Sequence, residues 1–152
     1  MHKVKRTVSG RKQKGAAAIE FAAVFVIFFG VFYALVSYSL PLLMMQSFNA
    51  ATSEAVRRSV ALSPTINNYS SLIVTQAQGV VSQQLNWMPA SLAQDVQQYT
   101  YVTYTAGVLK ARIAYPKANL QRILPVLSLP VIGEVPRLPT YLSAEASLQL
   151  VP

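Results

Sequence analysis

The sequence is dominated by an uncharged apolar stretch near its beginning. No Asp, Glu, Lys or Arg occurs between Phe21 and Met45. A helix over the 30 residues from Ala16 to Met45 would be about 45 Å long at ~1.5 Å per residue, more than the ~30 Å hydrocarbon core of a bilayer. We therefore predict a transmembrane helix over 16–45 that tilts or projects from the membrane. Pro41 is expected to kink this helix rather than to end it.

The pattern becomes amphipathic after Met45. Apolar or small residues recur at steps of three and four over Gln46–Leu62, which predicts that the same helix continues into a globular head with one buried face. Ser63-Pro64 is expected to stop it. A second amphipathic helix is predicted from a cap at Asn67 or Asn68. Its apolar positions are Tyr69, Leu72, Ile73, Ala77, Val80, Val81 and Leu85.

The rest of the chain has the chemistry of β-strands. Strands are predicted over Gln98–Thr105 and Val108–Tyr115, joined by a turn at Ala106-Gly107, and over Tyr141–Val151. A short turn is predicted over Leu92–Gln97, before the first of these strands. The proline-rich segment Lys117–Pro139 is expected to be a loop packed on the head, with one helical turn at Leu120–Leu124. The predicted fold class is α+β: a long transmembrane and stalk helix, a second amphipathic helix, and a small three-stranded antiparallel sheet in a head over 63–152.

The charges are unevenly distributed. Of the 13 Lys and Arg residues, six lie in the first 14 positions, where there is no acid. By the positive-inside rule this predicts a cytoplasmic leader over 1–15, which we expect to be disordered, and a head on the other side of the membrane. The basic balance therefore does not indicate nucleic-acid binding by the head.

Catalytic and metal chemistry have little support in the sequence. The chain has no cysteine and one histidine, in the leader, and its five acids show no paired spacing. A basic patch of Arg57 and Arg58 with Lys110 and Arg112 is conceivable, but solvated faces are the simpler interpretation. We expect no enzyme activity, no metal and no cofactor.

Glu20 is the one carboxylate near the apolar stretch, and three interpretations fit it. In an ordinary signal anchor it lies at headgroup level near the helix N-terminus, where it is solvated. A secretory signal cleaved near Ser37-Tyr38-Ser39 is a second possibility. In the third, a cut after Gly15 creates an amine at Ala16, four residues before Glu20. The carboxylate of one chain can then neutralise the amine of a neighbour in a filament.

The residues around the cut carry a family resemblance. Lys14-Gly15-Ala16-Ala17-Ala18-Ile19-Glu20-Phe21-Ala22 resembles the class III signal of type IV pilin-like proteins. Its alanine-rich form resembles the TadE-like family, the pseudopilins or minor pilins of the tight-adherence (Flp/Tad) pilus. The Ala- and Arg-containing helix over Gln46–Leu62, the strand ending in Tyr115-Pro116 and the last predicted strand are similar to the family's later parts.

The resemblance implies cleavage between Gly15 and Ala16 by a membrane prepilin peptidase, and a role for Glu20 and Phe21 in processing or assembly. Arg11, Lys12 and Lys14 would be the basic residues of the leader. The implied partners are the major Flp pilin, other minor pilins, membrane lipid, and the inner-membrane assembly platform with its secretion ATPase.

The implied function is assembly of a pilus for surface attachment or biofilm formation, from a single span in the bacterial inner membrane with the head in the periplasm. The major pilins of these systems are much shorter, which favours a minor subunit. The alternative is a signal-anchored periplasmic binding domain that never enters a filament.

Overall fold

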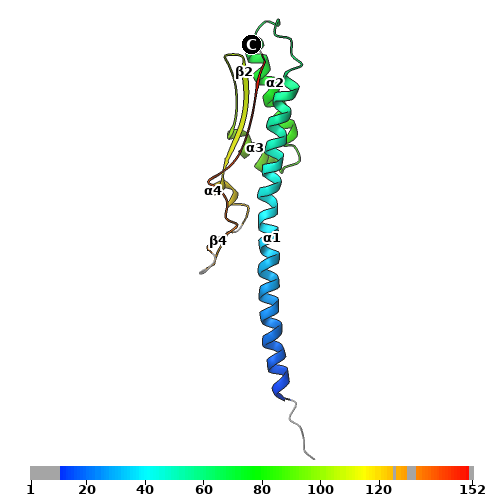
Figure 1. Cartoon of the computed structure of the whole chain (residues 1–152), viewed down its shortest axis with the longest axis vertical. Helices are drawn as coiled ribbons and strands as arrows, with labels where there is room; N and C mark the ends of the chain where they lie inside the picture. The colour runs from blue at the N-terminus through cyan, green and yellow to red at the C-terminus, as the bar shows by residue number, and fades with distance from the viewer. Residues whose placement is uncertain (1–10, 125, 130–132, 151–152) are drawn as a thin grey trace, which may run out of the picture. The chain divides into compact units, whose positions relative to one another are not determined.

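A computed structural model of the chain describes residues 11–124, 126–129 and 133–150, except the side chains of 11–14 and 129 (Figure 1). Residues 1–10 of the predicted leader, which extends to Gly15, lie outside the described residues. The chain divides into two compact units, the first ending at Val36 and the second beginning at Ser37. The second unit contains helices on one side of an antiparallel sheet, so the α+β prediction is confirmed.

The first helix, α1, comprises Arg11–Ser59. It therefore begins before Ala16, and the prediction of a disordered segment is wrong for residues 11–15. The physical reason is local composition, because Arg, Lys, Gln and Ala all favour helix and a single Gly15 costs only about 1 kcal/mol. The helix passes Pro41 without ending, as predicted.

The end of α1 precedes the predicted stop at Ser63-Pro64. The Ser59 hydroxyl donates to the Ala55 carbonyl at 2.7 Å. The amides of Ala61 and Leu62 then donate to carbonyls three residues back, at 3.3 and 3.2 Å, which tightens the chain into a turn. The helix therefore terminates through this turn before the proline is reached.

Helix α2 spans Tyr69–Gln84, and four residues of its predicted apolar face are buried: Ile73, Ala77, Val80 and Val81. Leu72 was predicted on the same face, but it is 44% exposed, because it lies about 100° around the helix from Ile73. Asn68 occupies the N-cap position, but it has φ 62° and its side chain makes no cap hydrogen bond. Instead its backbone carbonyl accepts from the amides of Ser71 and Leu72, both at 3.0 Å. The predicted position is thus right and the expected capping contact is wrong.

A three-stranded antiparallel sheet follows the short helix α3 (Ala90–Gln98). Its strands are β1 (Thr100–Thr105), β2 (Val108–Pro116) and β5 (Tyr141–Gln149), in the order β1-β2-β5. The predicted turn is confirmed: Ala106 and Gly107 have φ 50° and 78°, as a two-residue hairpin turn with two positive φ values requires.

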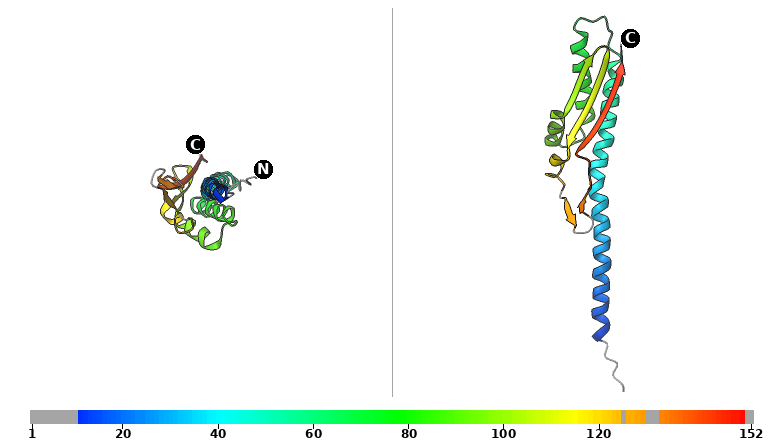
Figure 2. Two further views of the ribbon diagram at one scale, coloured as in Figure 1. Left: turned by 90° about the horizontal axis from the view of Figure 1, so that it is seen from below. Right: turned by 60° about the vertical axis from the view of Figure 1, so that its left-hand side comes forward.

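The core lies between this sheet and the helices (Figure 2). Alternate residues of β2 point inward, as predicted from their apolar character: Leu109, Ala111, Ile113 and Tyr115 are fully buried. Leu142 and Ala144 of β5 extend the same face. From the helices come Met44, Phe48, Ala51, Ala55, Ile73, Ala77 and Val81.

The proline-rich segment is more structured than predicted. Helix α4 covers Lys117–Leu120, and a hairpin is formed by β3 (Leu127–Leu129) and β4 (Gly133–Val135). These strands are only three residues long, and the prolines flank them, so no ladder position needs a proline N–H. The helical turn predicted over Leu120–Leu124 begins three residues earlier in the structure, at Lys117. A helical hydrogen bond is also present within the predicted range, from the Leu124 amide to the Leu120 carbonyl at 2.9 Å.

Candidate functional site

The predicted processing segment lies within α1. Gly15, Ala16, Glu20 and Phe21 are all exposed, and Glu20 follows Ala16 by one helical turn. Among the described residues, Glu20 has no hydrogen-bond or ion-pair partner. The backbone of Arg11, Lys12 and Lys14 belongs to the same helix. The predicted cleavage position between Gly15 and Ala16, the Glu20 carboxylate and the Phe21 ring are thus all accessible on this helix.

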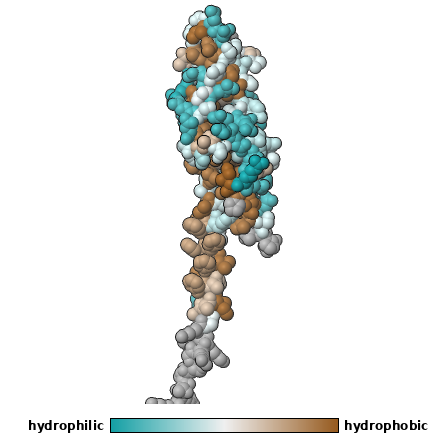
Figure 3. Space-filling model, turned by 180° about the vertical axis from the view of Figure 1, so that it is seen from behind, coloured by the Kyte–Doolittle hydropathy of each residue, from teal (hydrophilic) through white to brown (hydrophobic). Residues whose placement is uncertain are grey.

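Beyond Glu20, α1 carries two rows of stacked phenylalanines. The ring centroids of Phe21 and Phe25 are 6.1 Å apart, those of Phe25 and Phe29 6.2 Å, and those of Phe28 and Phe32 6.3 Å. Each of these side chains is more than half exposed. The rows follow from the i,i+4 spacing of phenylalanine, which is the signal for them in the sequence. They give the helix a continuous apolar surface (Figure 3).

One helix in the described part of the chain is long and apolar enough to cross a membrane, within Gly15–Ser59. Its first residue buried in the second unit is Ser37, followed by Pro41, Met44 and Phe48. The buried stripe therefore starts nine residues before Gln46, where the amphipathic pattern was predicted to begin. The 21 residues from Ala16 to Val36 span about 32 Å at ~1.5 Å each, close to the ~30 Å hydrocarbon thickness.

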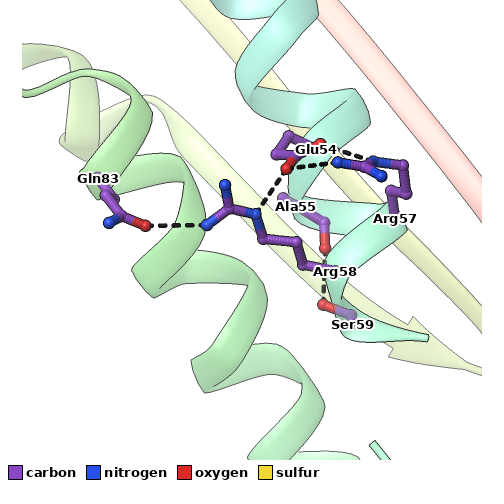
Figure 4. Close-up of polar contacts among 6 residues, drawn as sticks. All are labelled: Glu54, Ala55, Arg57, Arg58, Ser59 and Gln83. Atoms are coloured by element: carbon purple, nitrogen blue, oxygen red, sulfur yellow. Dashed lines mark hydrogen bonds and ion pairs between the residues drawn. The ribbon is translucent and has the colours of Figure 1, made fainter. Parts of the chain in front are cut away.

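A polar cluster joins α1 to α2 on the surface of the second unit (Figure 4). Both oxygens of Glu54 accept from Arg57, at 2.7 and 2.8 Å, and one also accepts from Arg58 at 2.6 Å. Arg58 donates onward to the Gln83 amide oxygen of α2 at 3.1 Å. The hydrogen bonds from Arg57 and then Arg58 lower the pKa of Glu54 to about 2.

A second cluster, centred on Asp95 of α3, was not predicted. The Tyr115 hydroxyl donates to the Asp95 carboxylate at 2.6 Å, and the Asn119 amide donates to it at 3.3 Å and to the Tyr99 hydroxyl at 3.1 Å. Burial, and then the bond to Asp95, raises the pKa of Tyr115. The inward side of β2 was the available signal, because a buried tyrosine hydroxyl needs a hydrogen-bond partner.

The cations of the second unit do not gather into one basic patch. Arg57 and Arg58 pair with Glu54, whereas Lys110 and Arg112 lie 2.8 and 3.9 Å from Glu145 on the sheet. The interpretation as separate solvated faces is therefore the better one. Within the described ranges, no group of three or more His, Cys, Asp or Glu side chains could hold a metal ion.

Comparison with known proteins adds one finding. Residues 15–57 match the family model described as TadE-like protein. No curated protein and no solved structure gave a match. The matched range contains Gly15, Glu20, the phenylalanine rows and the Glu54–Arg57 pair, and it confirms the resemblance that the alanine-rich signal suggested.

Proposed function

From the TadE-like segment at residues 15–57, we propose that the chain is a minor pilin or pseudopilin of a tight-adherence (Flp/Tad) pilus. The observation that carries the proposal is the exposed Gly15–Phe21 segment at the start of an apolar helix of bilayer length. The role is structural and requires no catalysis, metal or cofactor. Assembly of the pilus would serve attachment to surfaces or biofilm formation.

The proposed mechanism begins with cleavage between Gly15 and Ala16 by a prepilin peptidase. The cut removes the six leader cations and leaves an Ala16 amine one helical turn from Glu20. A single ionised side chain is unfavourable by roughly 3 kcal/mol at the centre of a membrane helix on insertion scales, and by less near its end. A partner of opposite charge is therefore favoured for Glu20 within a bundle of such helices. The amine of a neighbouring subunit can supply this partner and set the register between the helices.

The proposed topology follows from the charge asymmetry. The basic leader stays in the cytoplasm, the segment 16–36 crosses the inner membrane, and the second unit lies in the periplasm until the subunit enters the pilus. The partners are the peptidase, the major Flp pilin and other minor pilins, membrane lipid, and the assembly platform with its secretion ATPase. Phe21 and the phenylalanine rows provide the apolar contact surface for neighbouring helices.

The mature N-terminus is the first test. Mass spectrometry of the chain produced with its cognate peptidase should give a protein that starts at Ala16. A chain starting at Met1 would support the alternative of a signal-anchored binding domain, and one starting at Leu40 would indicate a cleaved secretory signal. Either result would overturn the pilin proposal.

The second test concerns charge at Glu20. Glu20→Gln should leave membrane insertion intact and abolish pilus assembly, whereas Glu20→Asp, which keeps the charge, should retain part of it. Glu145→Gln is the matched control because that carboxylate is exposed on β5, far along the chain from the cut. Normal piliation of the Glu20→Gln strain would refute the pairing mechanism.

A further inference from the structure

An open depression lies in the second unit, between α3 and the turn that follows α4. Its volume is about 370 Å³, within the ~300–1,000 Å³ range of small-molecule pockets. The side chains that line it include Gln94, Asp95, Gln98, Asn119, Arg122 and Ile123. All of them belong to the second unit and to the described part of the chain. The depression can therefore be analysed within one compact unit.

Two polar side chains of the depression are held in place by hydrogen bonds. Asp95 accepts from the buried Tyr115 hydroxyl through Oδ2, and the Asn119 Nδ2 donates to the same oxygen and to the Tyr99 hydroxyl. The other oxygen of each side chain, Oδ1, has no hydrogen-bond partner in the described ranges. Both residues are half-buried, and no buried side-chain N or O atom of the described residues lacks a partner. The two Oδ1 acceptors are therefore accessible, in an orientation that the fold sets before any ligand binds.

The charges of the depression balance. Of the described residues that line it, Asp95 carries the negative charge and Arg122 the positive one. The Arg122 guanidinium lies near the cluster, since its charge opposes the rise in the pKa of Tyr115, but it makes no hydrogen bond or ion pair with a described residue. An anionic ligand would be repelled by Asp95 and a cationic one by Arg122. The depression therefore favours a neutral polar ligand.

A saccharide has the chemistry that matches these groups. Each hydroxyl both donates and accepts a hydrogen bond, so neighbouring hydroxyls can donate to Asp95 and Asn119 while another accepts from Arg122. The side-chain amides of Gln94 and Gln98 are exposed and can also donate and accept. Ile123 is 50% exposed, and its side chain offers an apolar surface to the C–H groups of a sugar ring.

We propose that this depression binds one ring of a neutral saccharide. Asp95 and Asn119 accept hydrogen bonds from its hydroxyls, Arg122 donates to one of them, and Ile123 packs against the ring. The inference goes beyond the proposed function and does not depend on it, because every residue that it uses lies in the second unit. A wrong cleavage site would leave the saccharide site standing, and the reverse also holds.

NMR of the full chain, labelled with ¹⁵N in zwitterionic detergent micelles, tests this. The probes are the methyl glycosides of glucose, galactose and mannose, and detergents with sugar headgroups are avoided because they would compete. At least one glycoside should cause saturable shifts of the side-chain amide signals of Gln94, Gln98 and Asn119. The Asn49 amide on α1, which donates to the Met45 carbonyl, is the control signal and should stay in place. The absence of saturable shifts with all three glycosides would overturn the inference.

The charge of the ligand is tested on the ring that binds. Its uronic acid and its amino sugar are compared with the neutral glycoside at slightly acidic pH, where the first is an anion and the second a cation. The neutral form should bind most tightly. Tightest binding of the uronic acid would identify an anion site, and tightest binding of the amino sugar would identify a site for an amine such as a partner's lysine. Either result would overturn the saccharide assignment.

Arg122→Gln locates the binding site. It should weaken the affinity by about tenfold, as loss of one charge-assisted hydrogen bond predicts, and leave the Tm unchanged because the guanidinium has no partner among the described residues. Arg112→Gln is the matched control, since Arg112 is an exposed cation on β2 outside the depression. Unchanged affinity in Arg122→Gln, or an equal loss in Arg112→Gln, would overturn the site. Asp95→Asn should also weaken binding, and if that variant unfolds, the comparison of the two arginine variants decides.

Discussion

Replacing Tyr115 by phenylalanine tests the unpredicted cluster around Asp95. The substitution removes one hydroxyl, which donates to the carboxylate at 2.6 Å, and keeps the ring. The aromatic contacts with Phe48 at 6.5 Å and Tyr99 at 5.7 Å are therefore retained. Any loss of stability then reports the hydrogen bond rather than core packing.

The expected loss follows from the surroundings of the two groups. A hydrogen bond to a charged group contributes about 1.5–3 kcal/mol, and leaving a buried acceptor without its donor is the costly part. Asp95 is only half-buried and keeps the Asn119 amide at 3.3 Å, so water and Asn119 compensate in part. We expect a destabilisation of about 1–2 kcal/mol, and a decrease in Tm of roughly 4–8 °C for a unit of this size.

Thermal unfolding followed by circular dichroism in detergent micelles measures this effect. Tyr101→Phe is the matched control, since Tyr101 lies on β1 with 55% of its surface exposed and has no hydrogen-bond partner among the described residues. Its Tm should remain within the range of ordinary surface substitutions, about 0.5 kcal/mol either way. Equal Tm values for the two variants would refute the argument that the Asp95 bond stabilises the fold.

Three further changes test other parts of the second unit. Ala106→Asn should raise the Tm by an amount equivalent to about 0.5–1 kcal/mol, because asparagine tolerates the positive φ of 50° better than alanine; a lower Tm would contradict the turn geometry. The pKa of Glu54 is lowered from 4.5 to about 2, so its stabilising contribution is complete above about pH 4.5 and is lost as the pH falls towards 2. Urea unfolding of Glu54→Gln should therefore match the parent at pH 2 and show lower stability at pH 6, and a constant difference between them would refute this. Ala55→Leu should cost about 1–3 kcal/mol by overpacking a fully buried position, while Ala50→Leu on the exposed side of α1 should cost little; comparable Tm losses would show that the buried stripe is wrongly placed.

Periodic patterns in the sequence predicted the helices and strands that have one solvent-exposed face and one buried face. The alternation in β2 identified Leu109, Ile113 and Tyr115 as inward residues, and the steps of three and four in α2 identified Ile73 and Val80. In each case burial of one face dominates the local energetics, so hydrophobicity alone carries the information.

The features that the sequence did not predict share a different cause, because they depend on contacts that the hydrophobicity pattern does not encode. The stretch from Ser37 to Met45 is apolar whether it faces lipid or packs into a core, so composition could not show that its buried stripe begins at Ser37. The Asp95 cluster joins residues 20 and 24 positions apart along the chain, which no local pattern reports. The three-residue strands of β3–β4 are too short to show an alternation.

The two strands that pair with β2, β1 and β5, differ in their separation from it along the chain. β1 is joined to it by two residues, whereas β5 begins only after the 24 residues between Pro116 and Tyr141. Closing the longer loop loses more chain entropy, so the β1–β2 hairpin can form early and the β2–β5 pairing follows later. Folding of the second unit is therefore expected to be limited by the arrival of β5. Changes in the 117–140 segment should alter the refolding rate more than changes at the Ala106-Gly107 turn.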